Sequence, residues 1–311
     1  MYMMENFKQG RFADPTNDFA FKRIFGTEQY KDATIGLLNC LFTDVQVADV
    51  YFPNTEVIGE TGDSRKGFID VLCTDTEGNT FIVEMQNARQ EHFRERVIYY
   101  SSKIIARQAP SGEWDYGIMP TYVVAFLNFK IERLTPELAE EGRYLLRYRT
   151  TNIETGEKMP GSTEYIFLGI QDFDKSEEEL ETYPEKWLYL FRNTLTLEEI
   201  PDGFDKEKEF KAYFEACERA GFSKEEDEKY TQIMMNEWDI ANAKKLAVRE
   251  AREEGREEGR REGLAEGEAK GLKKGIAAGK AETAKNFLAA GVDIKIIAQC
   301  TGLDEATIRS L

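Results

Sequence analysis

The sequence contains a single histidine, His92, and this scarcity disfavours several kinds of catalytic site. A Ser-His-Asp apparatus needs a histidine to carry its proton, and His92 lies among charged neighbours where a surface position on a helix is expected. The phosphate-binding pattern G-x-x-x-x-G-K-[ST] is also missing, because Gly279-Lys280 is followed by Ala281. The sequence therefore supports neither a serine hydrolase nor a P-loop NTPase.

Cysteine pairs and long apolar runs are missing as well. The four cysteines are scattered, without a C-x-x-C pair or a metal-binding spacing: Cys40, Cys73, Cys217 and Cys300. We expect them to be reduced thiols of a cytoplasmic protein. No apolar run approaches the ~20 residues that span a bilayer, and the first residues lack the plan of a signal peptide. No membrane partner is therefore expected.

Positive charge is scarce overall, but its distribution is uneven. The net charge of −17 disfavours a nucleic-acid binder, because affinity for phosphates comes mainly from Lys and Arg. Residues 172–209 hold 13 acidic and 5 basic residues, whereas residues 87–108 hold 5 basic and 2 acidic residues. A local basic surface at residues 87–108 therefore remains compatible with DNA.

Two apolar segments around a polar loop are the most informative stretch that is present. Phe68–Leu72 and Phe81–Met85 are rich in β-branched and aromatic residues, and Asp75–Asn79 consists of turn-forming residues. This pattern predicts a β-hairpin. Each strand carries a carboxylate, Asp70 or Glu84, although an unpaired charge is expensive to bury.

The hairpin register decides whether these carboxylates meet. A five-residue loop would pair Thr74 with Thr80 and set Asp70 opposite Glu84, with side chains starting about 5 Å apart. A two-residue turn at Gly78-Asn79 would place them on opposite faces instead. Loop composition leaves both registers open, but two facing carboxylates form a site for a hard cation such as Mg²⁺ or Mn²⁺, which favours the first.

The same residues carry a resemblance to a known family. Asp70, followed fourteen residues later by Glu84-Met85-Gln86, resembles the Asp…Glu-x-Lys core of the PD-(D/E)XK nucleases. The chain is more similar still to their transposase or recombination-promoting branch, in which Gln takes the Lys position. The segment Asn17–Phe25 (NDFAFKRIF) is similar to the opening helix of that branch, and the resemblance covers roughly residues 12–195.

This resemblance implies a metal-dependent DNA endonuclease. Asp70 and Glu84 would hold Mg²⁺ or Mn²⁺, with the backbone carbonyl of Met85 as a third ligand. Gln86 would take the catalytic Lys position, where an amide can orient water but brings no positive charge. DNA would be the partner of the site.

Two further acids are candidate site residues. Asp14-Pro15-Thr16 predicts a helix start, and Asp18 and Lys22 then lie one turn apart. They form either an exposed ion pair, worth about 0.3 kcal/mol, or a further part of the site. Glu56, on a predicted strand Tyr51–Val57, either joins the site or faces the sheet edge.

Basic residues follow one side of the next predicted helix, from about Gln90 to Gln108. At about 100° per residue they fall beside its apolar face: Arg89, Arg96, Lys103 and Arg107. They are either ordinary charges flanking the core or a stripe that contacts DNA phosphates. We expect Arg96, Lys103 and Arg107 to bind DNA.

The order of elements predicts an α/β fold. A further helix is expected at about Glu28–Phe42, a strand covered on both faces at Thr121–Phe129, and two more strands at Tyr144–Thr150 and Glu164–Gly169. The resemblance implies a restriction-endonuclease-like mixed central sheet flanked by helices. We expect a nuclease-like domain at 1–200, a helical region at 201–248, a glycine-repeat segment at 249–285 and a small helical module at 286–311.

The C-terminal segment is distinguished by seven glycines at four-residue spacing, from Gly255 to Gly279. Each costs a helix about 1 kcal/mol relative to alanine, yet together they form a strip along which another backbone can approach. The segment is either a charged linker or a long helix through which the chain forms a homo-oligomer. Residues 284–311 resemble a helix-turn-helix, but Asp304–Leu311 holds one Arg and two acids, which favours docking over base readout.

Three functions remain open from the sequence. The first is the metal-dependent DNA endonuclease. The second is a catalytically inactive nuclease fold that acts as an interaction or DNA-binding protein and oligomerises through its C-terminal helix. The third is transposition, in which strand transfer follows cleavage.

Overall fold

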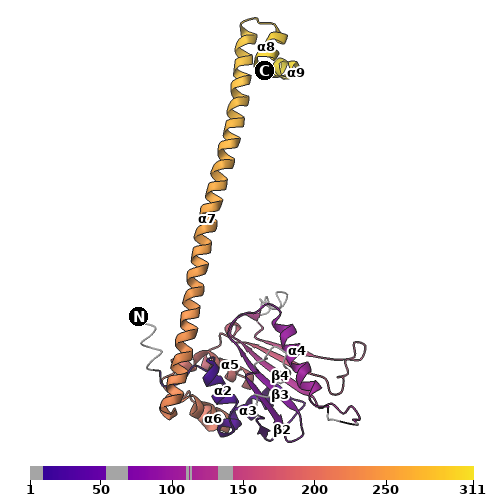
Figure 1. Cartoon of the computed structure of the whole chain (residues 1–311), viewed down its shortest axis with the longest axis vertical. Helices are drawn as coiled ribbons and strands as arrows, with labels where there is room; N and C mark the ends of the chain where they lie inside the picture. Colours follow the sequence, from indigo (N-terminus) through magenta and orange to yellow (C-terminus); the bar gives the residue numbers. More distant parts are fainter. Residues whose placement is uncertain (1–9, 54–68, 110–111, 113, 132–142) are drawn as a thin grey trace. The chain divides into compact units, whose positions relative to one another are not determined.

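The computed structural model describes residues 10–53, 69–109, 112, 114–131 and 143–311 (Figure 1). Two compact units divide the chain, residues 1–236 and residues 237–311. Glu56 and most of the predicted strand Tyr51–Val57 lie outside the described residues. In the part that is described, no helix is both long enough and apolar enough to cross a membrane.

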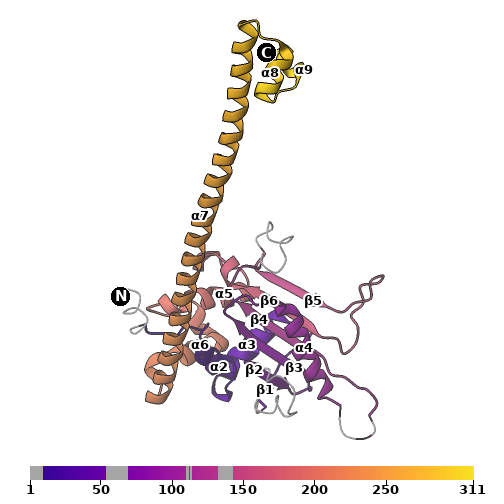
Figure 2. The same cartoon turned by 45° about the horizontal axis from the view of Figure 1, so that its top comes forward.

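Six strands of the described chain form one mixed sheet, in the order β1-β2-β3-β4-β6-β5 (Figure 2). Their bounds are β1 Val50–Tyr51, β2 Val71–Asp75, β3 Thr80–Gln86, β4 Thr121–Leu127, β5 Leu145–Arg149 and β6 Glu164–Gly169. β3, β4 and β6 run parallel, whereas β1, β2 and β5 pair antiparallel with their neighbours. The predicted mixed α/β sheet is confirmed. The first strand begins one residue earlier than predicted and ends at Tyr51, before Pro53, which lacks an N–H for a ladder.

Helices cover both faces of this sheet. Their bounds are α2 Asp18–Phe25, α3 Lys31–Leu41, α4 Phe93–Ala106, α5 Tyr183–Asn193 and α6 Lys208–Cys217. The larger core joins α2, α3, α5 and α6 to one face of the sheet, and the smaller core joins α4 to the other. All seven residues of β4 are buried, which explains why this strand is a continuous apolar run.

The opening helix α2 starts later than its sequence signal suggested. Asn17 is the N-cap, and its side chain accepts hydrogen bonds from the backbone N–H groups of Phe19 and Ala20. Asp14 instead accepts from the backbone N–H and the hydroxyl of Thr16, in a turn before the helix. The predicted cap at Asp14–Thr16 is therefore wrong by one to three residues.

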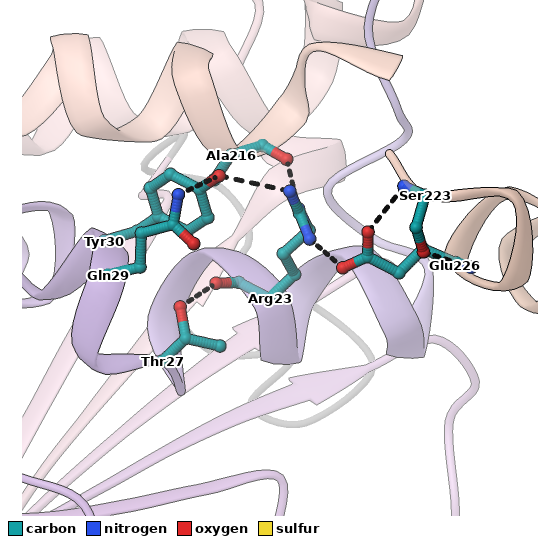
Figure 3. A network of polar contacts seen from close by, with 7 residues as sticks. All are labelled: Arg23, Thr27, Gln29, Tyr30, Ala216, Ser223 and Glu226. Carbon is teal, nitrogen blue, oxygen red and sulfur yellow. Dashed lines mark hydrogen bonds and ion pairs between the residues drawn. The ribbon is translucent and has the colours of Figure 1, made fainter. Parts of the chain in front are cut away.

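Arg23 connects α2 to the elements that close the first unit (Figure 3). Its guanidinium donates to the carbonyl of Ala216, to the hydroxyl of Tyr30 and to the carboxylate of Glu226. Ala216 belongs to α6, and Glu226 lies in the first turn of α7, which runs from Lys224 to Ala289. One buried arginine thus holds the ends of two C-terminal helices against α2.

The second unit consists of the rest of α7 followed by α8, Ile294–Thr301, and α9, Glu305–Ser310. Ala284, Ile297 and Ile308 form a small core where these helices pack. The glycine repeat lies inside the continuous helix α7. A side chain added at any of the seven glycines would meet no atom within 4 Å.

Candidate active site

The β2–β3 hairpin has the five-residue loop that the sequence allowed. Thr74 pairs with Thr80, as predicted, and Val71 pairs with Val83. The Asp75 carboxylate accepts from the backbone N–H of Asn79 and of Glu77, both at 2.9 Å, and fixes the loop. The alternative two-residue turn is wrong, because the backbone of Asp75 still bonds to Asn79.

This register sets the face of the sheet on which Glu84 lies. Val71 and Val83 belong to the larger core, and Leu72 and Ile82 belong to the core under α4. Asp70 lies in a bend one residue before β2, near enough to Glu84 for its charge to act on that carboxyl group. Because side chains alternate along strands, Glu84 lies on the α4 face of the sheet.

Gln86, two residues beyond Glu84 on β3, shares that face. Met85 points the other way and packs against the larger core. Its backbone N–H donates to Asp70 Oδ2 at 2.9 Å, which orients this carboxylate just before the start of β2.

Glu84 is a buried carboxylate in an unfavourable electrostatic environment. It is 5% exposed, and among the described residues it has neither a hydrogen bond nor an ion pair through its side chain. Burial, and then the charge of Asp70, raise the pKa of Glu84 to about 7, against a smaller opposing effect of Arg96. The buried carboxylate therefore lacks a direct positive partner.

Asp70 is also perturbed. Burial raises its pKa, and the charge of Asp18 acts in the same direction, while the Met85 N–H, Lys22 and Arg96 act against it. Two neighbouring carboxylates with raised pKa values offer hard oxygen atoms, the kind of ligand that suits Mg²⁺ or Mn²⁺. Within the described ranges, no three or more His, Cys, Asp or Glu side chains are arranged so that they could hold a metal ion.

The α2 helix reaches this site through Lys22. Its ammonium lies 2.6 Å from Asp18 Oδ1 and 3.8 Å from Asp70 Oδ1. The i,i+4 ion pair that the sequence suggested is present, and it extends to the site carboxylate. The sequence did not indicate the contact of Lys22 with Asp70, because the packing of α2 on the sheet sets this distance.

The α4 helix brings Arg96 to the same place. Arg96 donates from Nη2 to Gln86 Oε1 and from Nη1 to the side-chain oxygen of Gln90. The sequence predicts Arg96 on a DNA-binding stripe and a water-orienting role for Gln86, but it does not predict the hydrogen bond between these two side chains. Its one sequence signal is the position of Arg96 beside Phe93 and Val97, the residues that press α4 onto the sheet.

The rest of the predicted basic stripe is only partly helical. Arg89 precedes α4, which begins at Phe93, so the interpretation of four basic residues on one helix is wrong at its first member. Lys103 lies on α4 with its ammonium 4.6 Å from the ring centre of Tyr99, and Arg107 caps the helix. The structure thus brings together Asp70, Glu84, Gln86 and Arg96, with Asp18 joined through Lys22.

The fold is that of a nuclease-like protein: a mixed sheet flanked by helices, with a pair of carboxylates at the open end of a hairpin. The chain belongs to the PD-(D/E)XK nuclease family transposase family, whose sequence model matches residues 15–247. This match extends beyond the predicted limit at residue 195 and includes α6 and the start of α7. Neither the curated proteins nor the solved structures contain a match to the chain.

Proposed function

We propose that the protein is a metal-dependent DNA endonuclease. The observation that carries this proposal is the pair of neighbouring carboxylates at the open end of the hairpin, the buried Glu84 and the partly buried Asp70. Keeping Glu84 there without a direct protein partner costs folding free energy, so a structural role does not account for it. A divalent cation between the two groups would remove that cost.

The ligand set follows from the oxygen atoms at the hairpin end. Asp70, Glu84 and the backbone carbonyl of Met85 would hold Mg²⁺ or Mn²⁺, and the Met85 N–H would keep Asp70 oriented toward it. The bound cation would supply a water of lowered pKa and would neutralise charge at the scissile phosphate. Asp18 would act through Lys22, whose ammonium lies beside Asp70. Glu56, outside the described residues, stays a prediction.

DNA would approach along α4. Arg96, Lys103 and Arg107 are about one or two turns apart on this helix or at its end, on the side of the sheet that carries the carboxylates. We propose that they contact phosphates, which would offset the net negative charge of the chain near the site. A cytoplasmic location stays a prediction.

The test is nicking of supercoiled plasmid with Mg²⁺, Mn²⁺ or EDTA. Asp70→Ala and Glu84→Ala should each lower the rate by at least about 10³-fold, because each removes half of the carboxylate ligands. Glu77→Ala is the matched control, because Glu77 is an exposed acid in the loop of the same hairpin, and its rate should stay within about twofold of wild type. Activity that persists in both carboxylate variants contradicts the proposal.

Self-association is a second candidate function, and α7 favours it. Leu264, Leu272 and Ile276 are exposed large apolar side chains on α7, next to glycines that leave the helix surface bare. We propose that α7 pairs with α7 of a second copy along this strip. This pairing is compatible with cleavage and would be the main activity if the site proves inactive.

Light scattering tests the pairing directly. Gly267→Leu together with Gly271→Leu should convert oligomer to monomer, although both substitutions raise helix propensity. Ala265→Leu together with Ala269→Leu is the matched control, because these positions lie about 200° around the helix from the glycines. A monomeric wild type, or equal effects of the two pairs, contradicts the proposal.

A further inference from the structure

Arg96, which is partly buried, is held in an unusual way for an arginine. Its two hydrogen bonds go to the neutral amide oxygens of Gln86 and Gln90, and no carboxylate of the described residues lies within ion-pair distance. The ring of Phe93 supports the guanidinium, whose carbon lies 5.4 Å from the ring centre. Its Nε is buried and has no hydrogen-bond partner in the described part of the chain.

A guanidinium held by amides keeps its full positive charge. It has five N–H donors, and only two are used here, so donors remain for an anion. A buried donor without a partner destabilises the fold, and a bound water or ligand oxygen would remove that cost. Arg96 therefore has both the charge and the open donors that a phosphate requires.

The other cation at the site, Lys22, is different. Its ammonium is 2.6 Å from Asp18 and 3.8 Å from Asp70, so two carboxylates already surround it. Lys22 balances the charge of Asp70, whereas Arg96 is not neutralised by a direct ion pair. Of these two cations, Arg96 is the one available to a substrate.

Both ends of the Gln86 amide have a protein partner. Its Oε1 accepts from Arg96, and its Nε2 donates to the carbonyl of Ala88 at 2.6 Å. Arginine can only donate and a carbonyl can only accept, so the orientation of the Gln86 amide is fixed. Gln86 is 7% exposed, which leaves it suited to holding Arg96 in place.

We infer that Arg96 supplies the phosphate-facing positive charge that the motif position of Gln86 lacks, and that Gln86 is the positioning residue that holds Arg96. This inference rests on the proposed endonuclease function. A lysine at position 86 would carry the charge on β3, whereas here the charge comes from α4 and an amide on β3 orients it. Arg96 would bind a nonbridging oxygen of the scissile phosphate and stabilise the charge that develops there.

DNA binding in EDTA tests the inference without cleavage. Arg96→Ala should weaken binding of a short duplex and reduce the slope of log affinity against log salt by about 0.9, as expected for one lost phosphate contact. Lys211→Ala is the control, because Lys211 is an exposed base on α6, which packs on the other face of the sheet. An unchanged slope for Arg96→Ala contradicts the phosphate contact.

A double-mutant cycle with Mg²⁺ tests the role of Gln86. Arg96→Ala should lower kcat by about 10²–10³-fold, Gln86→Ala by about 10-fold, and the double variant should be no slower than Arg96→Ala alone. Losses that multiply would show that Gln86 acts independently and would overturn its positioning role. Arg94→Ala, an exposed arginine of the same helix, should leave kcat within about twofold.

Moving the charge gives a third readout. Gln86→Lys should lower activity, because the new ammonium would repel the guanidinium of Arg96, which the neutral Gln86 amide supports in the wild type. Adding Arg96→Gln should remove this repulsion and recover part of the rate. A gain of activity in Gln86→Lys alone overturns the inference. If the wild type fails to cleave DNA with every divalent metal, the proposed endonuclease function is contradicted, but the binding test in EDTA still applies. If the wild type is active and Arg96→Ala has the same kcat, only the inference about Arg96 is contradicted. If Arg96→Ala fails to fold, as judged by its thermal melt, Arg96→Lys replaces it.

Discussion

Two buried glutamates of the first unit have opposite environments. Glu185, at the start of α5, is 3% exposed and accepts from the Tyr144 hydroxyl at 2.6 Å, from Lys175 at 2.5 Å and from two backbone N–H groups of the preceding turn. Glu84, at the hairpin end, is 5% exposed, and in the described chain its side chain has no such partner.

Their titration reflects this difference. For Glu185 burial alone would raise the pKa, but the bonds from Lys175, Tyr144 and the backbone outweigh it and lower the pKa to about 2. For Glu84 burial acts together with a neighbouring carboxylate and raises the pKa to about 7. Burial therefore does not decide whether a carboxylate is structural. A buried carboxylate whose oxygens all accept hydrogen bonds stabilises the fold. A buried carboxylate without such bonds lowers the free energy of unfolding.

Removing the charge of each glutamate gives the largest expected contrast. Glu185→Gln should lower the free energy of unfolding by about 2–4 kcal/mol, because it weakens four hydrogen bonds, two of them to a capping turn. Glu84→Gln should leave it unchanged or higher in EDTA at pH 8, because it removes repulsion with Asp70. Urea unfolding followed by tryptophan fluorescence measures both, and Trp187 on α5 reports on this unit. A similar loss of unfolding free energy in both variants would contradict the proposed difference between Glu185 and Glu84.

Divalent metal should act on one glutamate only. At about 100 times its dissociation constant, Mg²⁺ should add about 2.7 kcal/mol to wild type and raise its melting temperature by roughly 5 °C or more. Glu185→Gln should keep this gain, whereas Glu84→Gln should lose most of it. Thermal melts with Mg²⁺ and with EDTA make the comparison, and Glu77→Ala is the control. A wild-type melt that ignores every divalent ion contradicts a metal site at Glu84.

The smallest effect is the shape of stability against pH in EDTA. The folded pKa of Glu84 lies above its ordinary 4.5, so the folded protein keeps a proton that the unfolded chain loses, and stability should fall as pH rises from about 4.5 to about 7. The folded pKa of Glu185 lies below 4.5, so its contribution is present above that pH and is lost as pH falls toward about 2. Melting temperature should therefore peak near pH 5. Glu84→Gln should flatten the alkaline side, and Glu185→Gln the acid side.

Local patterns explain how much of the site was predictable. The even spacing of Asp70 and Glu84 and the turn residues Asp75–Asn79 are local, and the predicted pairing of Thr74 with Thr80 is confirmed. The mixed sheet followed in the same way from strand patterns and from the resemblance. What these patterns do not specify is the distance at which helices pack on the sheet.

The packing distance of the helices accounts for the site contacts that the sequence did not predict. Arg96 meets Gln86 only because Phe93 and Val97 seat α4 on the sheet, and Lys22 meets Asp70 only because α2 packs on the opposite face. The start of α4 at Phe93, which leaves Arg89 outside, depends on the left-handed backbone of His92, with φ of 58°. None of these features has a periodic signal in the sequence.

The Arg23 network sets a lower limit to the length of the autonomous folding unit. Glu226 bonds to Arg23 (Figure 3). The hydroxyl of the buried Tyr230 accepts from the backbone N–H of Asp14 at 2.9 Å. Both partners come from the first turns of α7, after every element of the sheet. A chain shortened before residue 224 would retain Asp70, Glu84 and Arg96 but would leave Arg23 with a buried charge and a missing carboxylate. Because Arg23 follows Lys22 on the same helix turn, such a cut would also weaken the support of Lys22, whose ammonium lies 3.8 Å from Asp70.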